Sequence, residues 1–422
     1  MKNDSYRISK YSVYIILLGI LFISLNLPSP EVTKAFVVLE ISIGSFTITR
    51  LTLYLLLFLC IIFFIRNSHK IVLEKVDICF YILTLIIFLS VYQDLTSFSK
   101  LIYFFSAVYV SYIIGRITGL NTPTKRVVFF VEITTLVQVL LVLYSVFISP
   151  FGFEGVEGRD LFRSFNNKID GVEFSTRVTG TIGHPVVLAS FLTPGAVAFL
   201  IKSIAPGKHR LLNLFFFLIT FYVIFLTSSR GTWATLLILI VYLSLKYKLF
   251  KKVINVVIFT ILISYILLGP FFEYIIGRLS LTTMSDGSVS HRLYMYYWSI
   301  NQFINNPTLL LTGGGIGSVY SLLKSNPPPD HFLVVDNIYL TLFVETGLIG
   351  LVSFLLIILF VLRIKPISDE LFTIKIMIIA LMINGLTYDS FYWEQISIVF
   401  WVLVGFLISN NNNRYKYGGE NK

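Results

Sequence analysis

Four arginines lie in or beside the polar segments that border apolar runs: Arg177, Arg230, Arg278 and Arg292. A guanidinium group stays charged and binds phosphate oxygens through paired hydrogen bonds. Arg230 lies in the stretch 227–231, which separates two apolar runs with almost no loop, so its charge must face water or a partner. The alternative is an arginine that only extends into an interface. Several such groups in a partly dry cavity would suit a lipid-linked diphosphate.

Carboxylates form the second set of candidates. Asp336 begins a long apolar run, and Glu345 follows about two helical turns deeper in the same run. A carboxylate buried there needs a cation or hydrogen-bond donors. For Glu345 a structural pairing is favoured over a catalytic role, and Glu132, Asp389 and Glu394 allow the same two interpretations.

The histidines are scattered along the chain. His184 stands just before Pro185, where the chain begins an apolar run, and His331 lies in a loop shortly before Asp336. His291 belongs to a tyrosine-rich segment. A single histidine in a loop is usually solvated, and this spacing does not predict a metal site.

The composition excludes most soluble classes. Of 422 residues, 56% are hydrophobic and only 13% are charged, and the mean hydropathy is +0.83. A soluble domain carries about 25% charged residues. Aromatic residues at 16% exclude disorder, and two cysteines, Cys60 and Cys79, do not make a disulfide scaffold. The chain is therefore predicted to be an all-α integral membrane protein.

Apolar runs long enough to cross a bilayer set the number of spans. We predict about twelve transmembrane helices, with the first run retained rather than cleaved, at the following positions: 11–27, 49–65, 76–92, 98–115, 127–148, 182–201, 211–227, 232–246, 253–270, 338–362, 371–388 and 395–409.

The basic residues predict the orientation of these spans. With a cytoplasmic N-terminus, the short inside segments hold about two thirds of the Lys and Arg residues and about a quarter of the acidic ones. Both termini are therefore expected in the cytoplasm. The net charge of +11 is then an orientation signal and does not indicate a nucleic-acid partner.

Two outside loops are long, within what is otherwise one membrane domain over 1–422. They cover 149–181 and 271–337. Long connections tend to carry function. A transporter does not need them, whereas an enzyme that works at the outer face does.

The second loop contains a predicted interfacial helix over 289–304. Leu293, Tyr297 and Ile300 share one face of it, and Arg292 lies on another. Tyrosine and tryptophan in this helix suit the headgroup layer. The glycines of 313–317 that follow predict a tight turn, which is favoured over a phosphate-binding loop.

Several of these motifs together resemble the O-antigen ligase and polymerase superfamily, which are integral-membrane glycosyltransferases of GT-C-like type. The motifs that carry the resemblance are, in chain order, Gly180-Thr181 with Gly183-His184-Pro185, Leu226 to Trp233, Arg292 with Trp298 and Asn306-Pro307, Gly313 to Gly317, and Asp336-Asn337-Ile338-Tyr339-Leu340 with Glu345 and Gly347 to Gly350. Their order, spacing and expected membrane side carry the resemblance.

The resemblance implies transfer of a glycan from undecaprenyl pyrophosphate to an acceptor hydroxyl, without a metal or other cofactor. It also implies the inner or plasma membrane of a bacterial cell. We assign charge stabilisation to Arg230 and Arg292, with Arg177 or Arg278 as a third cation. Asp336 is the candidate that positions or deprotonates the acceptor, and His331 is held in reserve. Further substrate contacts are expected from His184, Asn337, Tyr339 and Glu345.

Three functions remain open. The ligase branch has His-Asn where this chain has Asp336-Asn337, which favours a Wzy-type polymerase acting on lipid-linked repeats of an O-antigen, capsule or exopolysaccharide. A ligase with another acceptor is the first alternative, and a lipid or polysaccharide transporter is the second. A chain-length regulator and a flippase would be partners of the polymerase.

Overall fold

A computed structural model describes residues 73–90, 100–101, 104–147, 168–169, 172–173, 177–248, 287–304 and 307–418. Within these ranges the architecture is helical, apart from one antiparallel pair of two-residue strands, β1 (Lys168–Ile169) and β2 (Val172–Glu173), in the first long loop. Three predicted spans, 11–27, 49–65 and 253–270, lie outside the described residues, as does Arg278.

Helices occupy the other predicted span positions. Their bounds are α4 Lys75–Ser90, η3 Phe105–Val110 continuing as α6 Ser111–Asn121, α7 Thr124–Phe147, α8 Pro185–Ile204, α9 Arg210–Leu226, α10 Arg230–Lys246, α16 Ile338–Arg363, α17 Asp369–Asn384 and α18 Glu394–Gly418. Of the described helices, α7, α8 and α16 are long and apolar enough to cross a membrane by themselves. The total of twelve spans therefore stays a prediction.

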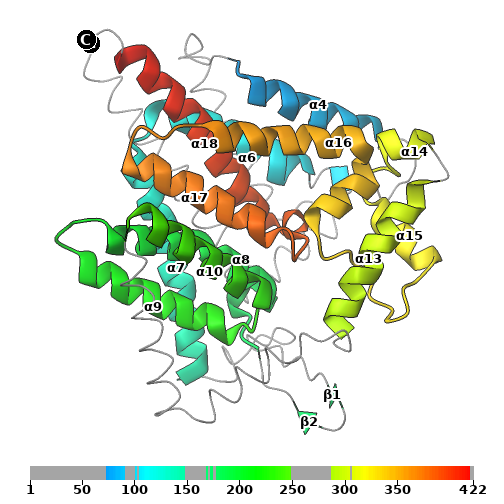
Figure 1. The fold of residues 1–422 in the computed structure, drawn as a ribbon, viewed down its shortest axis with the longest axis horizontal. Coiled ribbons are helices and arrows are strands. Elements are labelled where there is room, and N and C mark those ends of the chain that lie inside the picture. The colour runs from blue at the N-terminus through cyan, green and yellow to red at the C-terminus, as the bar shows by residue number, and fades with distance from the viewer. Residues whose placement is uncertain are drawn as a thin grey trace, which may run out of the picture.

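The helices pack into one bundle (Figure 1). α18 lies along α6, α16 along α4, and α8 lies between α7, α9 and α17. Inside the bundle, Arg116 donates to Asp77 at 2.8 Å and to Ser409 at 3.0 Å, and Tyr112 donates to Asp77 at 2.6 Å. Because a lone charge would be costly among apolar helices, this network ties α4, α6 and α18 together at one point.

The second long loop is helical in its described part. It contains α13 Gly287–Ile304, α14 Pro307–Thr312 and α15 Ser318–Ser325. These three helices gather at one end of the bundle, beside the start of α16 (Figure 1). A separate hydrophobic cluster holds them there, built from Met295, Trp298, Phe303, Val319, Leu323, Val335 and Val344.

The apolar face predicted for the helix 289–304 is exposed in α13, whereas the other face is only partly buried, because Tyr296, which shares it with Arg292 and Ser299, is 43% exposed. Leu293, Tyr297 and Ile300 are exposed, while Ser299 is buried and Arg292 is partly buried. An exposed apolar face with a tyrosine suits a membrane surface. The position of this helix on the outer leaflet remains a prediction.

Helix α16 is broken at Gly347, which has φ 65° and ψ −168°. The glycine turn docks at this break: the N–H groups of Gly314 and Gly315 donate to the carbonyls of Val344 and Glu345, at 2.8 and 3.0 Å. Because the break leaves these carbonyls without helical partners, the turn replaces the missing hydrogen bonds. The tight turn predicted over 313–317 is thus confirmed, and these two N–H groups face the helix.

Candidate functional site

The connection between α17 and α18, residues 385–393, forms the centre of the candidate site. It is locked to the start of α16, because Ile338 donates from its backbone to Gly385 at 3.0 Å and Tyr339 donates from its hydroxyl to Met382 at 2.9 Å. Asn337 donates from Nδ2 to the carbonyl of Leu386 at 3.1 Å. We call residues 385–393 the central loop.

Arg292 reaches the central loop from α13. Its Nη2 donates to the carbonyl of Thr387 at 3.3 Å. Arg292 and His291 also lie close enough to Asp336 for their charges to oppose the effect of burial on that carboxyl. One arginine therefore faces both the central loop and the segment that starts α16.

Asp336 sits in a strained turn. Its φ is +54°, a left-handed conformation that Asp and Asn tolerate better than other side chains. Burial raises the pKa of Asp336 above its ordinary value, and the positive charges of Arg292 and His291 oppose that rise. A carboxylate with a raised pKa is a stronger base than a solvated one, which fits the role predicted for this residue.

His291 holds the loop before Asp336 through both of its ring nitrogens. Its Nε2 lies 2.8 Å from the carbonyl of Val334, and its Nδ1 lies 2.7 Å from Oδ2 of Asp330. Both ring nitrogens face oxygen atoms, so the ring fixes the loop before Asp336 against α13. A single histidine in a tyrosine-rich helix gives no signal of this contact in the sequence.

Asn337 and Tyr339, both predicted to contact substrate, make internal hydrogen bonds. Asn337 caps α16, since its Oδ1 accepts from the backbone N–H groups of Tyr339 and Leu340 at 2.9 and 3.2 Å. Its Nδ2 donates to the hydroxyl of Tyr296 on α13 at 3.0 Å. In this structure these side chains hold the site together from within.

The turn between α9 and α10 carries Arg230 to the central loop. Arg177 donates to the carbonyls of Thr227 and Ser228 at 2.9 and 3.2 Å, and so fixes the end of α9. Gly231, the neighbour of Arg230, lies so close to Thr387 that a Cβ there would be 2.1 Å from its Oγ1. Arg230 therefore begins α10 directly beside the central loop.

His184 stacks on the central loop. Its ring centroid lies 5.5 Å from that of Tyr388 and 5.3 Å from that of Trp393. The predicted break before Pro185 is present as a short 3₁₀ turn, η4 (Gly180–Ile182), followed by Gly183 at φ 82°. This turn places His184 at the bundle end that also holds Arg230.

Glu345 and Asp389 are buried below this surface. Glu345 accepts from the N–H of Gly317 at 2.9 Å and from the hydroxyl of Tyr392, which agrees with the structural pairing favoured from the sequence. Asp389 accepts from the hydroxyl of Thr341 at 3.0 Å. Burial first, and then the charge of Glu345, raise the pKa of Asp389 well above its ordinary value.

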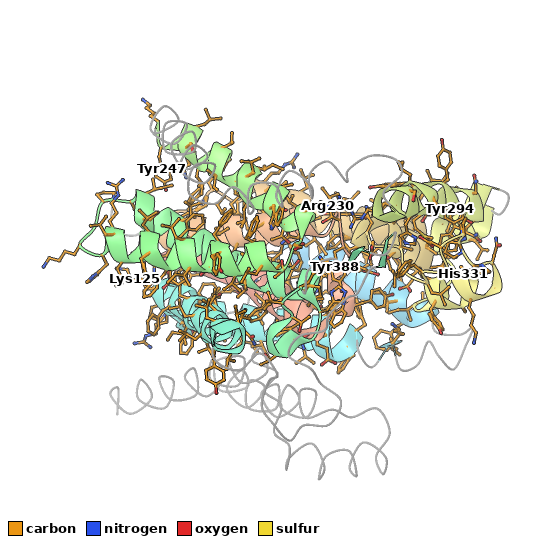
Figure 2. The ribbon with its side chains drawn as sticks, turned by 90° about the horizontal axis from the view of Figure 1, so that it is seen from below. Lys125, Arg230, Tyr247, Tyr294, His331 and Tyr388 are labelled. Carbon is orange, nitrogen blue, oxygen red and sulfur yellow. The ribbon has the colours of Figure 1, made fainter. Side chains whose placement is uncertain are left out.

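The structure thus brings together six of the residues predicted for the site: Arg177, His184, Arg230, Arg292, Asp336 and Asn337. Figure 2 shows Arg230 and Tyr388 near one another, whereas His331 lies at the far end of the molecule. His331 is exposed. Among the described residues, no cluster of three or more His, Cys, Asp or Glu side chains could hold a metal ion.

The central loop gives little signal in the sequence. Thr387, Tyr388 and Trp393 each contact a predicted site residue, yet only Asp389 was noted beforehand. The connection is short and follows an apolar run, so its length gives no signal. The one sequence feature that marks this loop is its four aromatic residues between two spans, in the stretch LTYDSFYW.

Comparison with known proteins adds one match. No curated protein matches the chain. Residues 215–355 match the model of a family described as O-antigen ligase. The matched range begins in α9 and ends in α16, and so includes Arg230, Arg292 and Asp336. Together with the apolar helices, this match indicates a membrane protein and confirms, over about one third of the chain, the resemblance to the O-antigen ligase and polymerase superfamily.

Proposed function

We propose that this protein polymerises lipid-linked oligosaccharide repeats, by moving a glycan from undecaprenyl pyrophosphate to the hydroxyl of another lipid-linked repeat. The observation that carries the proposal is the meeting of three segments of the matched range: Arg292 donates to Thr387 of the central loop, Arg230 begins α10 beside that loop, and Asp336 lies within electrostatic range of Arg292. The outer face of a bacterial inner membrane is the location that the loop lengths and basic connectors predict.

The reaction needs charge stabilisation more than it needs a strong nucleophile. The acceptor oxygen bonds to the anomeric carbon, the bond from that carbon to the diphosphate oxygen breaks, and the electron pair leaves with the diphosphate. Fixed cationic donors stabilise this developing charge by about 3–4 kcal/mol each in comparable sites. Arg292 and Arg230 are the donors we assign, because Arg292 donates to the central loop and Arg230 begins α10 beside it.

Asp336 receives the proton of the acceptor hydroxyl in this proposal. Its raised pKa and its position beside Arg292 suit a base next to a diphosphate. His331 is not assigned this role, because it is exposed and far from Arg230 (Figure 2). Asn337, Tyr339 and Glu345 are assigned to positioning, since their polar atoms bind other parts of the protein.

The choice of polymerase over ligase depends on Asp336-Asn337, where the ligase branch has His-Asn. The two functions differ in the acceptor. A polymerase extends one lipid-linked repeat with another, whereas a ligase passes finished polymer to a different molecule. Loss of a polymerase leaves single repeats on the lipid carrier, and loss of a ligase leaves long polymer there.

The test uses purified protein and a defined undecaprenyl-pyrophosphate oligosaccharide, with product length read on gels. We expect Arg230→Ala and Arg292→Ala to lose about 10²–10³-fold in the rate of extension. Arg363→Ala is the matched control. Arg363 is exposed at the opposite end of α16, a helix of 26 residues.

Wild-type extension in both site variants, at equal expression, would contradict the assignment. No extension by the wild-type protein, combined with transfer to an added non-lipid acceptor, would favour the ligase. Movement of the intact lipid across a vesicle, with no new glycosidic bond, would favour the transporter.

A further inference from the structure

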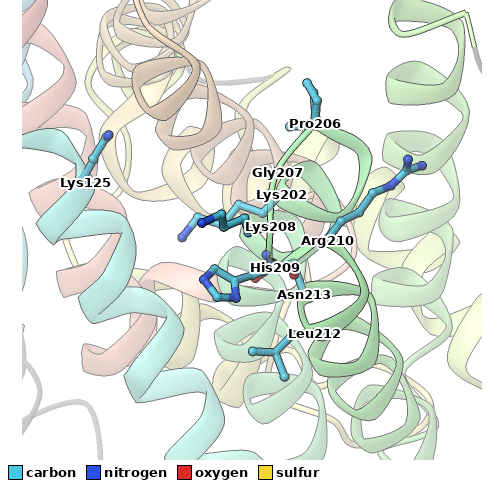
Figure 3. A pocket seen from close by; sticks show the side chains of 10 residues that line it. Lys125, Lys202, Pro206, Gly207, Lys208, His209, Arg210, Leu212 and Asn213 are labelled. Carbon is cyan, nitrogen blue, oxygen red and sulfur yellow. Dashed lines mark hydrogen bonds between the residues drawn. The ribbon is translucent and has the colours of Figure 1, made fainter.

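A hollow lies at the end of the bundle away from the candidate site, between α7 and the connection from α8 to α9. Its volume is about 580 Å³, and five basic or imidazole side chains line it: Lys125, Lys202, Lys208, His209 and Arg210. No carboxylate is among the described residues that line it. Figure 3 shows Lys208 and His209 reaching from the connection toward α7, while Arg210 points to the opposite side.

The charges of this hollow are only partly neutralised. Lys202 is paired with Glu132 at 2.6 Å, and Arg210 donates from Nε to the carbonyl of Ser203 at 2.6 Å. Lys125 lies 3.7 Å from Glu370, but its side chain is 82% exposed, so that pair is weak. Lys208 has no hydrogen-bond or ion-pair partner among the described residues. Lys125, Lys208 and His209 are therefore available to an anion.

Exposed apolar side chains lie beside the basic residues of the hollow. Leu212, which lines the hollow, is 48% exposed, and Phe215, one turn along α9, is 54% exposed. On the α7 side a second hollow of about 430 Å³ shares Lys125 and Lys202 and is lined by Phe129, which is 54% exposed. A ligand that fills both features has an anionic head and apolar chains.

The hollow is separate from the candidate site. The twenty residues of α8 place it about 30 Å along the helix from His184. In Figure 2, Lys125 and His331 lie at opposite ends of the molecule. The connectors that form it, 116–126 and 202–210, are among those predicted to face the cytoplasm, where anionic lipids attract basic segments.

We propose that this hollow binds the phosphate headgroup of an anionic phospholipid from the cytoplasmic leaflet. Lys125, Lys208 and His209 contact the phosphate, and the acyl chains lie along Leu212 and Phe215 on one side and Phe129 on the other. The proposal does not depend on the transfer reaction. A soluble phosphate ester satisfies the cations but leaves the apolar surface uncovered, so a lipid fits better.

The experiment measures lipid binding to the purified full-length protein by native mass spectrometry. Phosphatidylglycerol is compared with phosphatidylcholine of identical acyl chains. The test variant is Lys125→Gln/Lys208→Gln. The matched control is Arg363→Gln/Lys365→Gln, which removes two exposed charges from another connector predicted on the same side. We expect phosphatidylglycerol to bind the test variant at least about tenfold more weakly, and the control within about twofold of wild type.

Three results would overturn the proposal. Equal losses in both double variants would mean diffuse surface charge, and equal binding of phosphatidylcholine would mean that the headgroup is not recognised. Displacement of phosphatidylglycerol by an equal concentration of glycerol phosphate or inorganic phosphate would mean a site for soluble anions. If the double variant melts below wild type in phosphatidylcholine, Lys208→Gln alone replaces it, with an expected loss of about threefold.

Discussion

Arg292 on α13 donates from Nη2 to the carbonyl oxygen of Thr387, which lies 95 residues further along the chain. This hydrogen bond joins the helical part of the second long loop to the connection between α17 and α18. The guanidinium is thereby oriented beside Asp336 while its Nε makes no hydrogen bond within the described residues. One N–H of Nη2 is therefore committed to the protein, and the other N–H groups of this guanidinium include a buried one, on Nε, that the described residues leave without an acceptor.

Asp336→Asn separates function from folding. Asn tolerates the positive φ of this position and has nearly the same shape. If Asp336 accepts the proton of the acceptor, we expect extension to fall by about 10²–10⁴-fold. We also expect the acid limb of the wild-type pH–rate profile to lie above the ordinary range for an aspartate, since its pKa is raised.

The stability effect of the same change has a defined sign. A carboxyl whose pKa is higher in the folded state binds more protons folded than unfolded, so its contribution falls as pH rises from the unfolded to the folded pKa. At pH values above the folded-state pKa, Asp336 is charged, and burial of this charge lowers the free energy of unfolding. Asp336→Asn should therefore melt at or above the wild-type temperature at neutral pH. A lower melting temperature there would contradict this account.

Asn337→Ala should destabilise the protein without a specific catalytic defect. The change removes the cap of α16 and the hydrogen bonds to Tyr296 and Leu386. We expect a loss of about 1–3 kcal/mol in the free energy of unfolding. Asn337→Asp is the informative partner, since it keeps the cap and loses both donations. The melting temperature of Asn337→Asp should lie between those of Asn337→Ala and the wild type. A melting temperature below that of Asn337→Ala would mean that the cap is not the main contribution of this side chain.

Gly347→Ala tests the break in α16. A Cβ at this position would lie 2.3 Å from the carbonyl oxygen of Leu311, at a φ of 65° that side chains rarely adopt. We expect a loss of more than about 2 kcal/mol in the free energy of unfolding. Gly207→Ala is the control, because a Cβ there meets nothing within 4 Å. Equal melting temperatures for the two variants would mean that the break is not required.

Arg177→Ala distinguishes a positioning arginine from one that binds substrate. Because Nε and Nη2 of Arg177 donate to Thr227 and Ser228, we expect the variant to lose about 1–3 kcal/mol of stability. The extension rate per folded molecule should change far less than in Arg292→Ala. A full loss of rate in stably folded Arg177→Ala would instead place this guanidinium on the diphosphate.

The sequence predicted the local features of this molecule well. The glycine turn at 313–317, the exposed apolar face of α13 and the helix break before Pro185 all follow from residue types at short spacing. The central loop did not follow, because its importance arises from contacts with segments far away in the chain, such as Arg292 and His184. Hydrophobic periodicity predicts the faces of one helix at a time. It does not predict which loop the packed helices surround.

The break in α16 escaped prediction for a related reason. A single glycine inside an apolar run is compatible with a continuous helix, and Gly350 three residues later is helical. What distinguishes Gly347 is the close approach of Leu311 and Gly313, which belong to a different segment. Only the packed structure shows that approach.

The break in α16 at Gly347 lies between two packing environments along the helix. Leu340, Phe343 and Val344 pack with α13 to α15, whereas Phe354, Ile357 and Val361 belong to the large core of the bundle. The first two turns of α16 therefore lie between the two clusters, because Ile338 and Leu342 in the same turns belong to the large core. The start of α16 is thus a joint between the second long loop and the bundle, and any displacement of the loop helices would be transmitted to residues 385–393 through Asn337 and Ile338.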